Sequence, residues 1–243
     1  MEENRILIDR GHDAVLAVDV TPTFMPGGGL AVPGGDEIVP VVEDLAGSFK
    51  LRFATEDVHP FGHVGFAGSY QGVEANGEPL TLARIKGWAP NRVASPSFDL
   101  AYLRWYLEHC RGQQQMPWSY HGLPHWEETR LDRSLTWLGC AIFSKGEDPK
   151  CDSYSAFTDN LGRSTGFDGI LRGYGVTRLF VAGLALNFCV GFTALDAADL
   201  GFEVVLVEDA TRSVPIPGSV EAMIDRLRAK DIRFVASKDI VAP

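Results

Sequence analysis

The 243-residue chain lacks long hydrophobic runs, an excess of basic residues and any spacing pattern among its few cysteines. Its longest apolar runs have the length of strands, which argues against a membrane span, and its first residues lack the basic-then-apolar order of a signal peptide. With 22 Lys and Arg against 32 Asp and Glu, the net charge of −10 argues against nucleic-acid binding. We therefore expect a cytoplasmic protein that engages neither membranes nor nucleic acid.

The cysteines predict free thiols. They are scattered along the chain, so neither a disulfide framework nor a cysteine-rich zinc site is indicated; they are Cys110, Cys140, Cys151 and Cys189. Hydrophobic residues make up 45% of the sequence, which is enough for a substantial core. We expect residues 1–243 to form a single α/β domain.

Alternating strand and helix patterns predict the architecture. Apolar runs of strand length lie at 14–20, 51–55, 136–144, 179–182, 204–207 and 232–236. Apolar residues at helical spacing lie at 38–49, 98–110, 164–174, 189–200 and 219–230. Such alternation favours a mostly parallel central sheet covered on both faces, which is a three-layer α/β/α fold.

Residues 68–120 interrupt this alternation. They are rich in glycine, proline and polar residues, and they contain the amphipathic segment 98–110 as their main regular element. Long, aromatic-rich excursions from a compact domain are usually lids or subunit contacts. We expect an inserted region of one of these two kinds, and a homo-oligomer.

Three chemically distinctive residues stand where predicted strands end. Asp19 closes the first strand, Lys145 follows the third, and Cys189 opens the helix after the fourth. The carboxyl ends of parallel strands share one edge of a sheet, where ligands bind, so we expect these side chains to meet. The N-terminus of a helix lowers the pKa of a thiol, which makes Cys189 a candidate nucleophile. The alternatives are a core cysteine and a solvated lysine.

Carboxylate and imidazole groups follow the second strand. Asp57, His59 and His63 have the spacing Asp-x-His-x-x-x-His, which suits a divalent metal such as zinc, iron or manganese. These residues form an incomplete ligand shell, so another histidine has to come from elsewhere. The candidates are His109, His121 and His125. Surface histidines in a loop are the alternative.

Four blocks of the sequence together carry a family resemblance. They are AVDVTPTFMPGGGLAVPGG (17–35), TEDVHPFGHVGFA (55–67), KGEDPKCDSYSAFTDN (145–160) and VAGLALNFCVGFTALDAADLGFEVVLVEDA (181–210). The chain resembles the nicotinamidases (pyrazinamidases) of the isochorismatase-like cysteine hydrolase superfamily. The resemblance implies the isochorismatase-like hydrolase fold. It also implies an amidohydrolase that converts nicotinamide to nicotinate and ammonia through a cysteine thioester.

The resemblance implies a catalytic role for each matching residue. Cys189 matches the nucleophile, Asp19 the acid and base, and Lys145 the third member of the triad. The backbone N–H groups of Ala185 and Cys189 match the oxyanion hole. An unusual cis peptide bond is expected at Leu184-Ala185.

Metal ligands are implied in the same way. Asp57, His59 and His121 match the ligands of a divalent ion, for which zinc is the leading candidate and iron and manganese are alternatives. His63 matches a further histidine that binds the metal directly in only some members. The sequence around His121 differs from the family pattern, so His125 competes for its place.

Phe24 and Trp118 match the aromatic residues that sandwich the pyridine ring. The chain departs from the family at 20–23, where Val-Thr-Pro-Thr replaces a stretch with Gln-Asn-Asp, and at 186–188, where Leu-Asn-Phe replaces Thr-Asp-(His/Tyr). These departures leave an alternative open, a metal-containing relative that hydrolyses another aromatic or substituted-pyridine carboxamide. A catalytically inactive binding protein is disfavoured because all three triad residues are retained.

Overall fold

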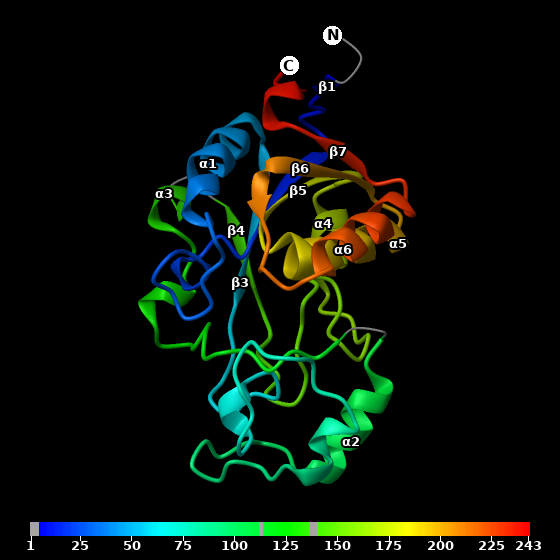
Figure 1. The fold of residues 1–243 in the computed structure, drawn as a ribbon. Coiled ribbons are helices and arrows are strands. Elements are labelled where there is room, and N and C mark those ends of the chain that lie inside the picture. Colours follow the sequence, from blue (N-terminus) through cyan, green and yellow to red (C-terminus); the bar gives the residue numbers. More distant parts are fainter. Residues whose placement is uncertain (1–4, 112–113, 137–139) are drawn as a thin grey trace.

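A six-stranded parallel sheet with the order β4-β3-β2-β5-β6-β7 forms the centre of the computed structural model, which describes residues 5–111, 114–136 and 140–243. The strands are β2 (Asp13–Val18), β3 (Leu51–Asp57), β4 (Ala141–Lys145), β5 (Arg178–Leu184), β6 (Glu203–Arg212) and β7 (Arg233–Val235). A short parallel pair, β1 (Ile6–Leu7) with β8 (Ile240–Val241), lies near both chain ends (Figure 1).

Helices cover both faces of this sheet, which confirms the predicted three-layer α/β/α architecture (Figure 1). One face carries α1 (Val39–Ser48) and α3 (Arg133–Thr136), and the other carries α4 (Phe167–Gly173), α5 (Gly191–Asp199) and α6 (Ser219–Arg228). Single turns of 3-10 helix are η1 (Pro22–Phe24), η2 (Asp36–Ile38), η3 (Ala67–Ser69), η4 (Arg84–Gly87), η5 (Glu127–Thr129) and η7 (Ser237–Asp239). No helix within the described residues is long and apolar enough to cross a membrane.

The order of the strands reverses between β2 and β5. From β2 the chain proceeds outward to β3 and β4, then returns to the other side of β2 and continues through β5, β6 and β7. In open parallel sheets the loops at such a reversal diverge and leave a crevice at the carboxyl ends of the strands. Asp19 directly follows β2 and Ala185 directly follows β5, so both lie at this crevice.

A glycine permits the two central strands to meet at the crevice. Gly183 has a φ of +120°, and a Cβ built on it would lie 2.0 Å from the carbonyl oxygen of Val18. Any side chain here would push β5 away from β2. Gly183 therefore fixes the spacing between the loops that begin at Asp19 and Ala185.

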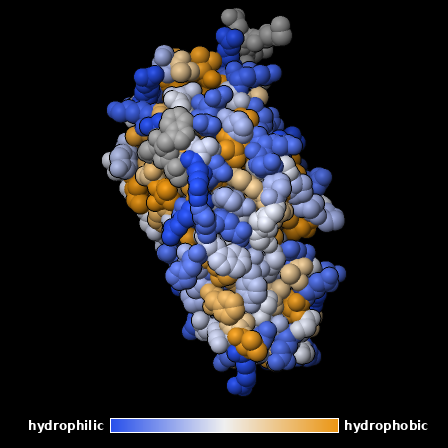
Figure 2. Space-filling view, turned by 90° about the vertical axis from the view of Figure 1, so that its left-hand side faces the viewer, coloured by the Kyte–Doolittle hydropathy of each residue, from blue (hydrophilic) through white to orange (hydrophobic). Residues whose placement is uncertain are grey.

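The excursion, residues 68–120, contributes to a second buried cluster apart from the main core. It carries the helix α2 (Leu100–His109), whose first turn is capped by the Asp99 side chain accepting a 2.8 Å hydrogen bond from the N–H of Tyr102. The cluster consists of Val64, Tyr70, Leu80, Ile85, Phe98, Leu103, Tyr106 and Cys151. In Figure 1 this region forms the part of the molecule farthest from both termini. The face drawn in Figure 2 shows hydrophobic residues in small groups separated by hydrophilic ones.

Three predicted elements differ from the structure. The strand expected at 136–144 begins at Ala141 as β4; Thr136 belongs to the short helix α3, and residues 137–139 lie outside the described part. The helix expected from Ser164 starts at Phe167, after Gly166 with its φ of +85°. The helix expected to begin at Cys189 begins at Gly191, as α5. Cys189 lies in the preceding irregular turn, η6 (Leu186–Val190), in which Phe188 is non-helical at φ −134° and ψ −107°.

Candidate active site

Three buried side chains meet at the crevice. The Nζ of Lys145 lies 3.0 Å from Oδ2 of Asp19 and 3.4 Å from Sγ of Cys189. Asp19 is 0% exposed, Lys145 3% and Cys189 7%. Lys145 is therefore no solvated surface lysine, and the sulfur faces an ammonium group instead of packing only against hydrocarbon.

Neighbouring strands hold the acidic and basic members of this group. Asp19 adopts a left-handed conformation with a φ of +50°, and its carboxylate accepts a 2.6 Å hydrogen bond from the hydroxyl of Thr55 on β3. That hydroxyl also accepts a 3.0 Å hydrogen bond from the N–H of Asp19. Lys145 donates to Oδ1 of Asp57 at 2.7 Å and to the carbonyl of Ser153 at 3.0 Å. These contacts leave both side chains little freedom to rotate.

The prediction of a lowered thiol pKa is wrong. Burial raises the pKa of Cys189 well above its usual value, and although Lys145 opposes this effect, Asp19 reinforces it. Position next to a helix cannot outweigh the removal of the thiol from water. The resting sulfur is therefore a thiol, which needs a neighbouring base to become a nucleophile.

Asp19 has the properties of that base. Burial raises the pKa of its carboxyl above the ordinary range, against the opposing charge of Lys145. A carboxylate with a raised pKa binds a proton more readily, which suits a group that accepts and later returns one. Burial alone would lower the pKa of Lys145, but Asp19 and Asp57 outweigh it and raise that pKa, so the lysine stays charged.

The loop after β5 brings Ala185 and Cys189 to the same place. The peptide bond Leu184-Ala185 is cis, as expected from the family resemblance. The carbonyl of Ala185 accepts hydrogen bonds from the N–H groups of Phe188 and Val190, at 2.9 and 3.1 Å, which folds the loop into a tight turn. Ala185 and Cys189 both line the pocket described below.

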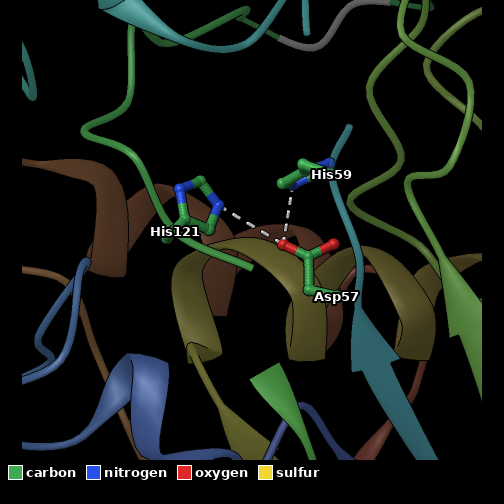
Figure 3. Close-up of side chains that lie close together, drawn as sticks. All are labelled: Asp57, His59 and His121. Atoms are coloured by element: carbon green, nitrogen blue, oxygen red, sulfur yellow. Dashed lines mark ion pairs between the residues drawn. The ribbon is translucent and has the colours of Figure 1, made fainter. Parts of the chain in front are cut away.

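A second buried group comprises Asp57, His59 and His121. The Nε2 atoms of His59 and His121 lie 2.9 and 3.4 Å from the same oxygen, Oδ2 of Asp57, and both rings point toward it in Figure 3. Two ligand atoms of a tetrahedral zinc ion lie roughly 3.3 Å apart. The three donor atoms thus converge at distances that suit one metal ion.

The other ring nitrogens of these histidines favour metal binding. The Nδ1 of His59 lies 3.0 Å from the carbonyl of Gly146, and the Nδ1 of His121 lies 2.8 Å from the carbonyl of Ser119. A carbonyl accepts a hydrogen bond, so each Nδ1 carries a proton and a neutral ring turns the lone pair of Nε2 toward Asp57. Burial alone would lower the pKa of His59, but Asp57 raises it to about 9, so without a cation Nε2 of His59 carries a proton, which a metal ion would displace.

The remaining histidines lie outside this group. His63 stacks on His59 with ring centroids 4.2 Å apart, and it belongs with His59 and Asp152 to a separate group of neighbouring donor atoms. Burial lowers the pKa of His63 to about 3, so its ring is neutral. His109 and His125 are exposed and belong to neither group. The structure thus selects His121 over His109 and His125.

One pocket joins the cysteine to the metal-binding group. It is lined by Phe24, Leu30, Asp57, His59, Trp118, His121, Asp152, Tyr154, Ala185, Phe188, Cys189 and Val214. Its walls are aromatic: the Phe188 ring lies edge-on to Trp118, with centroids 4.9 Å apart, and 5.4 Å from Tyr154. The sequence-based expectation covered Phe24 and Trp118 but missed Tyr154 and Phe188. Both residues lie in the sequence blocks that carry the family resemblance, 145–160 and 181–210, and this position is the signal that could have revealed them.

Comparison with known proteins places this arrangement in a family. The isochorismatase domain family matches residues 114–238, about half of the chain, and the chain belongs to that family. A nicotinamidase of Escherichia coli (strain K12) is 36% identical over 208 residues, which cover 84% of both chains. Within the isochorismatase family, the chain thus resembles a nicotinamidase along most of its length.

Solved structures extend this similarity to the fold. The Acinetobacter baumanii nicotinamidase (pyrazinamidase) superimposes with a TM-score of 0.80 at 29% identity, covering 96% of this chain and 99% of that one. A pyrazinamidase of Pyrococcus horikoshii in complex with zinc gives a TM-score of 0.64 at 28% identity, covering 93% of this chain and 99% of that one. The family match begins only at residue 114, after Asp19 and Asp57. The structural alignment with the Acinetobacter baumanii enzyme covers 96% of this chain, so the similarity extends well beyond the region of the family match.

Proposed function

We propose that this chain hydrolyses nicotinamide to nicotinate and ammonia, with Cys189 as the nucleophile. The observation that carries the proposal is an aromatic pocket lined by both Cys189 and a three-residue metal-binding group, with the buried Asp19–Lys145 pair behind it and Lys145 in contact with the Cys189 thiol. Similarity to nicotinamidases supports the choice of substrate. An unactivated amide is a poor electrophile with a poor leaving group, so hydrolysis needs a strong nucleophile and a proton donor together.

In the first half of the reaction, Asp19 removes the proton of Cys189 and the sulfur attacks the carboxamide carbon. The carbonyl becomes an oxyanion, and we assign its stabilisation to the N–H groups of Ala185 and Cys189, which both line the pocket. The protonated Asp19 then donates its proton to the departing nitrogen, so that ammonia leaves and a thioester remains. Lys145 stays charged and stabilises the anionic sulfur and carboxylate in turn.

In the second half, water attacks the thioester carbon. Asp19 accepts one proton of that water, the carbon–sulfur bond breaks, and the proton returns to the sulfur. The acid is released and the thiol is restored. One carboxylate thus acts alternately as base and acid, a role for which a pKa raised by burial is suited.

We infer that Asp57, His59 and His121 bind a divalent metal ion, and zinc fits this donor set of two imidazoles and one carboxylate. When bound, the ion supplies a Lewis-acid contact for the ring nitrogen of the substrate, directly or through water, and so orients the ring. His63 would support the site by packing on His59, since it lies outside the converging group.

A second candidate substrate class is favoured by one observation. Phe188 presents an apolar ring to the pocket at the position where the family has histidine or tyrosine, and Leu30 and Val214 are further apolar lining residues. A wall of this kind would accept another aromatic or substituted-pyridine carboxamide. The aromatic walls therefore select for a flat ring, but they do not specify which substituents that ring carries.

An ammonia-release assay tests the proposal. Purified protein is analysed for bound metal and then incubated with nicotinamide, pyrazinamide, benzamide and ring-substituted nicotinamides, with and without chelator. We expect release from nicotinamide that Cys189→Ala abolishes while metal stays bound. The matched control Cys140→Ala alters a cysteine just before β4, at the other end of this strand from Lys145. It should leave the activity unchanged. Wild-type protein inactive on every amide would refute the proposal, and activity only on the other amides would favour the second candidate.

A further inference from the structure

A buried carboxylate lies beside the metal-binding group without a counter-ion. Asp152 is 2% exposed and lines the pocket, yet it forms no ion pair with any Lys, Arg or His of the described residues. Its oxygens accept two hydrogen bonds, from the N–H of Ser153 and from Nε2 of Gln115, both at 2.8 Å. Neutral donors reduce the cost of burying a charge but do not cancel the charge.

The charges that surround the pocket are unequal. Asp19, Asp57 and Asp152 are three buried carboxylates, and Lys145 is the buried ammonium group that contacts the first two of them. With His59 neutral, as a metal-bound histidine is, full ionisation of these four groups leaves two negative charges uncompensated. A divalent cation held by Asp57 would compensate both, provided that Asp152 lies near it.

Asp152 lies beside the cation that Asp57, His59 and His121 would bind, but it does not form a second metal site with His59 and His63. One carboxylate oxygen of Asp152 and one ring nitrogen each of His59 and His63 lie within 4.8 Å of one another. His59 cannot serve two metal ions, because its Nδ1 faces the carbonyl of Gly146 and only Nε2 is free. Asp152 therefore stands next to the first group as an outer neighbour.

The excursion holds this carboxylate in place. The hydroxyl of Tyr106, on α2, donates a 2.6 Å hydrogen bond to Oε1 of Gln115 and accepts a 3.3 Å hydrogen bond from the N–H of Asp152. With the contact from Gln115 to the carboxylate, these bonds form a closed ring of three residues. Gly65 packs on it so tightly that a Cβ there would lie 2.8 Å from Oδ2 of Asp152.

We propose that Asp152 is a positioning residue for the cation site, supplying the second buried negative charge that a divalent ion requires. The excursion fixes that charge through Gln115 and Tyr106. The inference rests on the metal site of the proposed function. It gives the excursion a structural task within the site in addition to any role as a lid or subunit contact.

Metal affinity tests this assignment without any turnover measurement. Asp152→Asn keeps the size of the side chain and removes its charge, and chelator competition gives the affinity for Zn²⁺. Loss of an outer partner of a metal site typically costs about 10- to 100-fold in affinity, so we expect a loss of at least about ten-fold. The matched control Asp148→Asn removes a partly exposed carboxylate from the same loop, where it pairs with Arg163, and should change the affinity less than about two-fold. Equal affinities of the two variants would overturn the proposal.

Thermal unfolding separates this role from a purely structural one. In metal-free protein Asp152→Asn removes the cost of burying the charge but also its attraction to the His59 ring, so the readout is the rise in Tm on adding Zn²⁺. The rise in Tm on adding Zn²⁺ should be smaller in Asp152→Asn than in wild type, and Tyr106→Phe should show a partial loss of that rise. A metal-free variant that is destabilised but keeps the full rise would show that Asp152 only supports the loop. Wild-type protein that binds Zn²⁺ in these ways but releases no ammonia would refute the proposed function alone.

Discussion

The charges around Cys189 predict opposite effects of two substitutions on the reactivity of the thiol. Lys145→Met removes the ammonium group that lies 3.4 Å from Sγ and keeps much of the aliphatic stem. At an effective dielectric constant of about 20, a unit charge at that distance contributes about 5 kcal/mol, or about 3.6 units of pKa, as an upper limit. The pKa of Cys189, already raised by burial, should rise further, and the thiolate fraction at pH 7 should fall at least about ten-fold.

Asp19→Asn should act in the opposite direction. Removing this carboxylate takes away a negative charge that raises the pKa of Cys189, so the thiolate fraction should increase at any pH below that pKa. Turnover should nevertheless fall by about 10²- to 10⁴-fold, because the group that moves protons is lost. Faster alkylation with slower catalysis is the signature that distinguishes a base from a residue that merely maintains the fold.

The rate of carbamidomethylation by iodoacetamide between pH 6 and 10, followed on the Cys189 peptide by mass spectrometry, measures both effects. Cys189→Ala identifies the background from the other cysteines, and Cys140→Ala shows the effect of a substitution outside the pocket. In wild type the rate should keep rising above pH 9, because burial raises the pKa of the Cys189 thiol above the ordinary value of 9.0. Slower alkylation in Asp19→Asn, or faster alkylation in Lys145→Met, would refute the electrostatic reasoning.

Three further predictions concern the metal ligands, the decline of activity at low pH and the packing of the central strands. His121→Ala should lower the affinity for Zn²⁺ by at least about 100-fold in chelator competition, whereas His125→Ala should leave it unchanged, since only the first side chain converges with the other donors. Burial raises the pKa of Asp19, and the deprotonated form is the base, so kcat/KM should decline as the pH falls through a value above 3.8; a decline only below 3.8 would contradict this assignment. Gly183→Ala should destabilise the protein by about 3 kcal/mol in urea denaturation, while Gly47→Ala, which has open space around it, should not.

Much of the architecture could be predicted from the sequence because strand ends carry polar residues that a core strand would exclude. Asp19 directly follows the buried strand β2 and Lys145 closes the edge strand β4, and a parallel sheet brings such ends to one edge. The same reasoning placed Asp57 and His59 beside them. Boundaries were less predictable: Thr136, expected to open the third strand, ends α3 instead, and apolar runs of this length suit either element.

Other features depend on tertiary contacts that no local pattern reveals. The thiol pKa of Cys189 is set by its burial and by two carboxylates from other strands, which a rule about helix termini leaves out. The choice of His121 over His125 depends on how the chain after the excursion folds back onto β3. The contact of Gln115 with Asp152 joins residues 37 positions apart, and Gln115 lies in the excursion, whose composition predicted little regular structure.

The departures from the family pattern separate the catalytic groups from the wall that contacts the substrate. The hydroxyl of Thr23 donates to Glu128 at 3.1 Å and accepts from the N–H of Gly122 at 3.3 Å, which ties the loop after β2 to the loop that carries His121.

Asn187 donates to the carbonyl of Val214 at 2.9 Å and to the hydroxyl of Ser219 at 2.7 Å, which anchors the start of α6. Thr23 and Asn187 therefore serve the scaffold and are absent from the pocket lining, whereas Phe188, which belongs to the second departure, faces the pocket. Because Phe188 contacts Trp118 and Tyr154 but belongs to neither buried charged group, the wall can change its selectivity while the positions of sulfur, carboxylate and ammonium stay fixed.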